Sequence, residues 1–209
     1  MTPHFTVILI GSVLFALPVL GYIRWRFGGP DTLSFIILSG GFTAIMDFIS
    51  AFVAVNYEYP GRSSLWVFTF IFFGWMSMCG SCLFLAEGII VRKGQDLITQ
   101  RRRLWQVPLL TAMIAVVLDL FIDPVAVKAG YWVWFVKGTV YFEIPLLNYV
   151  GWFVLMFLAP LSWILIARYR DWSYLRKGVV SLAALIPLCL ASIVLSLLLN
   201  GAVAALGLQ

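Results

Sequence analysis

Residues 178–206 read GVVSLAALIPLCLASIVLSLLLNGAVAAL and contain no charged side chain. A helix needs about 20 mostly apolar residues to cross the hydrocarbon core of a bilayer, so this run is long enough for one crossing. Five further stretches have the same property, at about residues 5–23, 33–55, 64–91, 105–122 and 148–167. Continuously apolar runs satisfy their backbone groups in lipid as helices, whereas barrel strands alternate in polarity. The sequence therefore predicts an all-α, polytopic membrane helix bundle with six transmembrane helices.

The composition supports a membrane protein. Of the 209 residues, 63% are hydrophobic and 11% are charged, whereas a soluble domain is about 45–50% apolar and about 25% charged. This balance excludes a soluble enzyme, a disordered chain and a disulfide-stapled secreted module. No internal repeat or soluble segment is visible, so we expect residues 1–209 to form a single transmembrane domain. Residues 1–4 contain no Lys or Arg, so no cleavable signal peptide is predicted.

The basic residues predict the orientation. Most of the 14 Lys and Arg residues lie in the first, third and fifth connections: Arg24, Arg26, Arg92, Lys93, Arg101, Arg102, Arg103, Arg168, Arg170, Arg176 and Lys177. Positive residues are retained on the cytoplasmic side, so these connections face the cytoplasm and both termini face outward. We expect an integral protein of a prokaryotic-type cell membrane. Anionic lipid headgroups explain the basic clusters and the net charge of +5 without a nucleic-acid partner.

The fourth connection, at about residues 123–147, is long and aromatic, with Pro124 and Pro145 near its ends. Trp and Tyr favour the headgroup level of a membrane. We therefore expect an interfacial or re-entrant element here. A seventh transmembrane helix is the alternative.

The nine acidic residues are unevenly placed. Asp31, Asp96 and Asp171 lie in the basic connections, where we expect solvated charges, and Glu87 lies where it can pair with Arg92 or Lys93. The predicted topology places the other five in the outer half or the outer connections: Asp47, Glu58, Asp119, Asp123 and Glu143. An ionisable group inside a membrane helix indicates a functional site by default. The structural alternative is an ion pair or hydrogen bond, such as Asp123 with Lys128 or Glu143 with Lys137.

Two of these acids share one helical face, since Asp119 and Asp123 are four residues apart. Aromatic and amide side chains gather on the same side of the membrane: Tyr57, Tyr59, Tyr131, Trp132, Trp134, Tyr141, Asn148 and Trp152. An aromatic belt explains such residues, but an aromatic cleft with carboxyl groups inside it is the sharper hypothesis. A carboxyl group removed from water can stay protonated at neutral pH and act as an acid, and ring faces stabilise a nearby cation. This combination suits protonation of a carbon–carbon double bond, although a proton or ion pathway would use the same residues.

Other chemistries lack their residues. His4 is the only histidine, which excludes a histidine-ligated metal site and a Ser-His-Asp triad. Cys79 and Cys82 form a C-x-x-C in the middle of an apolar span, where close helix packing is the expected role. No phosphate-cradling glycine loop and no clustered aspartate motif for a divalent cation is present. We expect no metal and no cofactor.

Residues 119–153 read DLFIDPVAVKAGYWVWFVKGTVYFEIPLLNYVGWF and resemble the signature of the carotenoid hydratase family. This family includes the bisanhydrobacterioruberin hydratases of archaea and related 1,2-hydratases of bacteria. The resemblance rests on Asp119, Asp123, Pro124, Gly130, Trp132, Trp134, Gly138, Tyr141, Pro145, Leu146, Asn148, Gly151 and Trp152. A glycine is common in the family where Glu143 stands. The resemblance implies a cofactor-independent membrane enzyme that adds water to the terminal double bond of a linear carotenoid.

We therefore expect a lyase that acts on a lipid-soluble isoprenoid, with membrane lipid as its surroundings. The predicted catalytic residues are Asp119 and Asp123, then Asp47 and Glu143. The predicted substrate-binding residues are Tyr57, Tyr59, Trp132, Trp134, Tyr141, Asn148 and Trp152. A membrane terpenoid or polyprenyl cyclase with the same proton donor is one alternative. A small proton-coupled carrier is the non-enzymatic alternative.

Overall fold

The computed structural model describes all residues except 1–2, 92–94, 100–103, 137–138 and 207–209. Six helices are long and apolar enough to cross a membrane. They are α1 (Pro3–Phe27), a composite helix over Gly29–Val53, α4 (Ser64–Ile90), α5 (Gln106–Lys128), α6 (Leu146–Ala167) and α7 (Tyr174–Ala205). These helices confirm the six predicted spans and the all-α bundle, and no seventh helix of this kind lies in the described part of the chain.

The composite helix runs through the middle of the bundle and contacts α1, α4, α6 and α7. It consists of α2 (Gly29–Phe35), the π-helical segment η1 (Ile36–Gly41), α3 (Phe42–Phe48) and the π-helical segment η2 (Ile49–Val53). Wide π turns disrupt the regular ladder of hydrogen bonds and often occur at functional sites. Near η1, the hydroxyl of Thr43 donates to the carbonyl of Ser39 at 2.7 Å. Asp47 lies just before the second wide turn.

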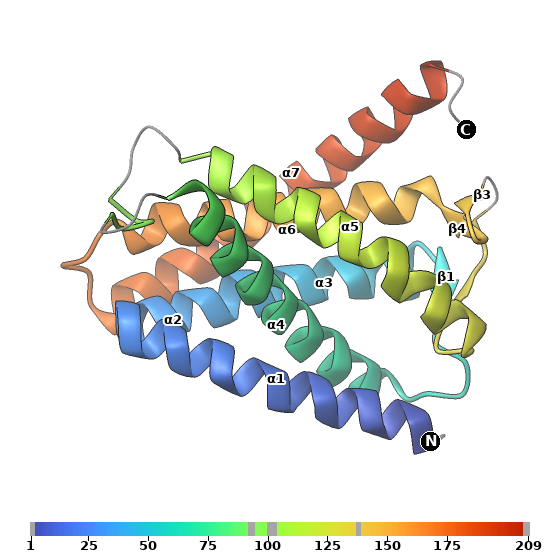
Figure 1. Ribbon diagram of the computed structural model, residues 1–209, viewed down its shortest axis with the longest axis horizontal. Coiled ribbons are helices and arrows are strands. Elements are labelled where there is room, and N and C mark those ends of the chain that lie inside the picture. Colours follow the sequence, from blue (N-terminus) through green and yellow to red (C-terminus); the bar gives the residue numbers. More distant parts are fainter. Residues whose placement is uncertain (1–2, 92–94, 100–103, 137–138, 207–209) are drawn as a thin grey trace.

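The two ends of the bundle differ in amino-acid composition. We call the end with residues 54–63, 129–136 and 139–145 the aromatic end, and the end with residues 24–31 and 168–176 the basic end. Helix α1 begins and helix α7 ends toward the aromatic end (Figure 1), as an even number of crossings requires.

The fourth connection differs in detail from the expected interfacial element. Helix α5 continues past Pro124 to Lys128, because neighbouring helices can accommodate a proline in a membrane helix. The rest forms short strands: β2 (Val133–Trp134), β3 (Thr139–Tyr141) and β4 (Ile144–Pro145). Strand β2 pairs antiparallel with β1 (Tyr57–Glu58), with Tyr57 opposite Trp134, whereas β3 pairs with β4. The β1–β2 pair joins the second connection to the fourth.

The expectation that Asp31 is a solvated charge was wrong. Its side chain is buried in α2 and forms an ion pair with Lys177, which is 1% exposed. The indole of Trp163 also donates to the backbone carbonyl of Asp31 at 2.9 Å. Asp31 is buried because the composite helix begins at Gly29 rather than near residue 33. This contact joins α2, α6 and α7 at the basic end.

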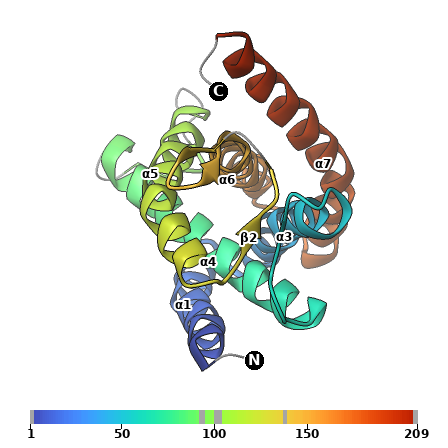
Figure 2. The ribbon, with the colours of Figure 1, turned by 90° about the vertical axis from the view of Figure 1, so that its right-hand side faces the viewer.

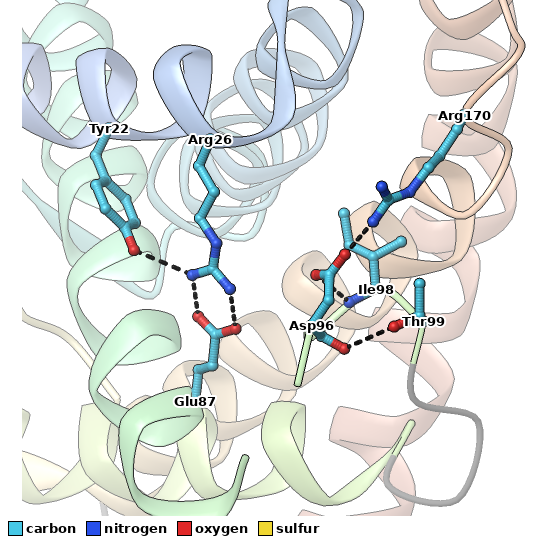
Figure 3. Close-up of polar contacts among 7 residues, drawn as sticks. All are labelled: Tyr22, Arg26, Glu87, Asp96, Ile98, Thr99 and Arg170. Atoms are coloured by element: carbon cyan, nitrogen blue, oxygen red, sulfur yellow. Dashed lines mark hydrogen bonds and ion pairs between the residues drawn. The ribbon is translucent and has the colours of Figure 1, made fainter. Parts of the chain in front are cut away.

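Glu87 has a different partner from the two predicted for it, which lie outside the described residues. Both of its oxygens accept hydrogen bonds of 2.6 Å from Arg26 on α1 (Figure 3). Asp96 forms an ion pair with Arg170 in the same region, and its carboxylate also accepts from the backbone of Ile98 (Figure 3). These contacts connect segments at the basic end, and they account for Glu87 and Asp96 as structural groups.

Candidate active site

A cavity of about 540 Å³ lies in the half of the bundle next to the aromatic end. Helices α3, α4, α5, α6 and α7 contribute to its wall, together with the segments around β1 and β2. The segment that carries β2 crosses this end of the bundle (Figure 2). Most of the lining side chains are apolar or aromatic, as in sites for lipid-soluble ligands.

The paired acids of α5 lie at this cavity. Asp119 is 0% exposed and Asp123 is 2% exposed, and Asp123 lines the cavity. The two carboxyl groups are close enough to interact with one another. Oδ1 of Asp119 and Oδ2 of Asp123 have no hydrogen-bond partner among the described residues. The i, i+4 spacing on one helix face brings the two groups together.

Helix α6 provides the polar neighbours of this pair. Asn148 lines the cavity and donates from Nδ2 to Oδ2 of Asp119 at 2.6 Å. Tyr149 follows it, with a buried hydroxyl that has no hydrogen-bond partner within the described part of the chain. This hydroxyl lies within electrostatic range of Asp119 and Asp123. The carboxyl pair therefore has one amide donor and an adjacent unused phenol.

Asp47 forms a second acidic centre on α3. Its Oδ1 accepts hydrogen bonds from the hydroxyls of Tyr57 and, at 3.4 Å, Tyr59. Its Oδ2 accepts from Nε1 of Trp75 at 2.6 Å. Both oxygens of this carboxyl group are therefore occupied by donors. Burial raises the pKa of both Tyr57 and Tyr59 well above the ordinary value, and the nearby Asp47 charge adds to this effect, so both remain hydrogen-bond donors.

The turn after η2 positions these tyrosines. The backbone N–H of Asn56 donates to the carbonyl of Ser50 at 3.0 Å, and its side-chain amide donates to the hydroxyl of Ser50 at 3.0 Å. Val55, just before it, has a φ of 53°, which is rare for a β-branched residue. A strained backbone conformation persists only where surrounding contacts hold it in place. The turn at Val55 and Asn56 reverses the chain, so Tyr57 in β1 points back toward Asp47.

Aromatic rings form much of the cavity wall. The ring centroids of Tyr57 and Trp134 are 4.6 Å apart, and those of Tyr59 and Trp132 are 6.0 Å apart. On the helices, Trp75 of α4 packs on Trp152 of α6 with a centroid distance of 4.4 Å. All six rings line the cavity. They supply ring faces that can stabilise a positive charge.

Most of the residues predicted for the site come together in the structure. Eight of them line the cavity: Asp47, Asp123, Tyr57, Tyr59, Trp132, Trp134, Asn148 and Trp152. Asp119 lies directly behind Asn148 and Asp123. Tyr141 and Glu143 do not line the cavity, since both are exposed in the β3–β4 hairpin. Glu58 is likewise exposed.

Sequence reasoning missed Trp75, Tyr149 and the serines of α7. Trp75 carried a usable signal, because a tryptophan deep inside an apolar span is far from the interface where this residue type is expected. Tyr149 carried a similar one, next to Asn148. Ser192 and Ser196 line the cavity from α7, and nothing in their local sequence distinguished them from other small residues in a membrane helix.

The comparisons with known proteins agree with the chemistry of this cavity. The family model described as carotenoid biosynthesis protein matches residues 4–208, which is nearly the whole chain. No curated protein and no solved structure matches the chain. The match confirms the kind of family that the motif at residues 119–153 suggested and indicates a role in carotenoid biosynthesis. The chain belongs to the carotenoid biosynthesis protein family.

Proposed function

We propose that this protein adds water to the terminal carbon–carbon double bond of a linear carotenoid, with no cofactor. One observation carries the proposal: two interacting buried carboxyl groups, Asp119 and Asp123, lie at the wall of an aromatic cavity inside a membrane bundle. The family match indicates carotenoid biosynthesis, and the resemblance of residues 119–153 to carotenoid hydratases favours hydration.

The carboxyl pair supplies the proton. Two ionised carboxylates repel one another, so two interacting buried carboxyl groups favour a state in which one of them keeps a proton. Asp123 lines the cavity, whereas Asp119 lies behind it and is held by Asn148. Asp123 therefore donates the proton to the less substituted carbon of the double bond.

The proton transfer converts a trisubstituted double bond into a tertiary carbocation. The π electrons of the double bond form the new C–H bond, and the carboxyl pair keeps the electrons of its O–H bond. Ring faces of Trp75, Trp152 and Trp134 are available in the same cavity to stabilise the positive charge. Such stabilisation is largest where water is scarce, as in this apolar cavity.

Water then captures the cation and restores the acid. An oxygen lone pair of water forms the C–O bond, and the proton released from the water returns to the carboxyl pair. The net change is the addition of one water. Polar side chains that line the cavity are available to hold this water, namely Ser50, Asn56, Asn148, Ser192 and Ser196. Their presence favours hydration over the cyclisation that would follow in a dry site.

Lipid-extract mass spectrometry tests the proposal in a host that accumulates linear carotenoids. We expect cells with the intact protein to contain a carotenoid heavier by one water, and growth in ¹⁸O-labelled water to place the label in it. Asp123→Asn should abolish this product, whereas Glu58→Gln, on the surface, should retain it. A new pigment of unchanged mass would indicate a cyclase instead. An unchanged pigment profile would contradict hydration.

We also propose that the aromatic end faces outward and the basic end faces the cytoplasm. The basic end carries Arg24, Arg26, Arg168 and Arg170, and positive residues near helix ends are retained on the cytoplasmic side. The carotenoid site then lies in the outer half of the membrane. The substrate reaches it from the lipid phase.

A further inference from the structure

We infer that the two acidic centres of the cavity have separate roles, and that Asp47 is a permanent carboxylate that stabilises the carbocation without transferring a proton. This inference rests on the proposed function and assigns a role within the same site. It makes Trp75 a positioning residue, since Trp75 acts through Asp47. The carboxyl pair of Asp119 and Asp123 alone exchanges protons with the substrate and water.

The first observation is the hydrogen bonding of Asp47. Three donors from two elements converge on its two oxygens: Tyr57 and Tyr59 at Oδ1, and Trp75 at Oδ2. An indole N–H can only donate, so Oδ2 must accept. Complete burial disfavours the charged form of the Asp47 carboxyl group, and the hydrogen bonds from these three donors oppose that effect. A carboxylate with both oxygens occupied in this way is a poor acceptor for a further proton.

The second observation is the contrast with the carboxyl pair. Asp119 receives one hydrogen bond from an amide, and one oxygen of each carboxyl group has no donor among the described residues. The two groups instead interact with one another. Two buried like charges that interact disfavour one another, so the resting pair retains a proton. Asp47 therefore has the hydrogen-bond donors that a charged carboxylate needs, whereas Asp119 and Asp123 have fewer of them and share a proton.

The third observation is the placement of the two centres. Asp47 and Asp123 both line the cavity, from α3 and α5 respectively. They are close enough for the charge of Asp47 to act on Asp123. The Trp75 ring, whose N–H holds Asp47, packs on Trp152. A cation formed beside Asp123 therefore has a fixed negative charge and aromatic rings within the same enclosure, where charges interact strongly.

With these separate roles for Asp47 and the carboxyl pair, protons and charges balance over the reaction cycle. The pair gives its proton to carbon and becomes doubly charged, while the substrate becomes a cation and Asp47 remains a carboxylate. After water adds, its proton returns to the pair. Asp47 has the same protonation state at every step, which is why its donors can remain in place throughout. No reorganisation of its hydrogen bonds is needed when the charge develops.

Infrared spectroscopy of the purified protein in lipid nanodiscs at neutral pH tests this inference without substrate. The wild type should show the carbonyl stretch of a protonated carboxyl group, with a shift in heavy water. Asp47→Asn should leave this band in place and reduce the carboxylate band. Asp119→Asn and Asp123→Asn should each shift or abolish it, so the test survives if one of them fails to fold. The other six acids are ion-paired or exposed, and Glu58→Gln is the control.

Two spectra would overturn the inference: a wild type without the protonated band, or an Asp47→Asn protein that has lost it. In the hydration assay, Asp47→Asn should lower the rate about 10²- to 10³-fold, the usual effect of removing one preorganised electrostatic group. Asp47→Glu should restore part of it because the charge returns. Equal inactivity of the Glu and Asn variants would count against a charge effect. If the infrared spectra are as expected but no carotenoid is hydrated, the proposed function is refuted. The assignment of charges to Asp47 and to the carboxyl pair then still stands.

Discussion

Asn148 on α6 donates a hydrogen bond of 2.6 Å from its side-chain amide to Oδ2 of Asp119 on α5. The contact joins a residue that lines the cavity to a carboxyl group that is completely buried behind it. Helices α5 and α6 pack along one another in this region. The amide therefore both orients the acid and ties together the two helices that carry the signature of residues 119–153.

Asn148→Leu should weaken both functions of this contact. A buried group that loses its partner costs about 1–3 kcal/mol, so we expect thermal unfolding in detergent at a lower temperature. We also expect at least a tenfold loss of hydration rate, because Asp119 loses its only amide donor among the described residues. Leu147→Met, next to it on the cavity wall, conserves volume and serves as the control. Wild-type hydration by Asn148→Leu would contradict the assigned role.

Alkaline pH should destabilise the aromatic end. Burial raises the pKa of Tyr57 and Tyr59 well above the ordinary value, which is about 10. Above that pH the unfolded chain releases these protons and the folded chain keeps them, so the free energy of unfolding decreases as pH rises. The slope is about 1.4 kcal/mol per pH unit for each tyrosine. Unfolding measured from pH 8 to pH 11 should become less pH-dependent in Tyr59→Phe; an unchanged slope would show that Tyr59 ionises normally.

Breaking the buried ion pair at the basic end should destabilise the bundle. The side chains of Lys177 and Asp31 are 1% and 8% exposed, and removal of one partner from a buried pair costs about 3–5 kcal/mol. Lys177→Met should therefore lower the unfolding temperature strongly. The double variant Asp31→Asn, Lys177→Met should recover most of this loss, because no unpaired buried charge remains. The product of the reaction should be unchanged in both, since the pair does not line the cavity.

Glu143→Gly should stabilise the protein slightly. Glu143 has a φ of 64° in the β3–β4 hairpin, and left-handed backbone costs about 1–2 kcal/mol for a residue with a Cβ. Glycine avoids this strain but loses about 0.5–1 kcal/mol in chain entropy, so the net gain is about 0.5–1 kcal/mol. Glu143→Ala removes the charge and keeps the Cβ, so it should bring no such gain. A higher unfolding temperature for Ala than for Gly would exclude the backbone explanation.

Cysteine labelling in intact cells tests the proposed orientation. Ser63→Cys places a thiol at the aromatic end and Thr99→Cys places one at the basic end, and both positions are exposed. A membrane-impermeant maleimide should label only position 63. Labelling of the protein without an added cysteine gives the background from its three native cysteines, two of which are buried. Labelling of position 99 alone would reverse the orientation and place the carotenoid site in the inner half of the membrane.

The sequence was sufficient for the helices, because length and polarity alone govern whether a segment can cross a bilayer. It also predicted that Asp119 and Asp123 share one face, which follows from the period of a helix. It failed at Asp31, whose contact with Lys177 depends on how α2 and α7 pack, and it did not predict that Arg26 of α1 pairs with Glu87 of α4. It also assigned Glu143 to the site, although the β3–β4 turn places that side chain at the surface.

The sequence by itself determined a six-helix membrane protein with acids and aromatic rings gathered toward one end. Hydrophobic length and helical periodicity are local properties, so they can be read without a structure. Only the tertiary structure decided which acids have hydrogen-bond donors and which lie beside another acid. Trp75 and Tyr57 reach Asp47 across 28 and 10 positions of the chain, while Asn148 reaches Asp119 across 29. Such contacts join separate elements and depend on packing, so the local sequence does not show them.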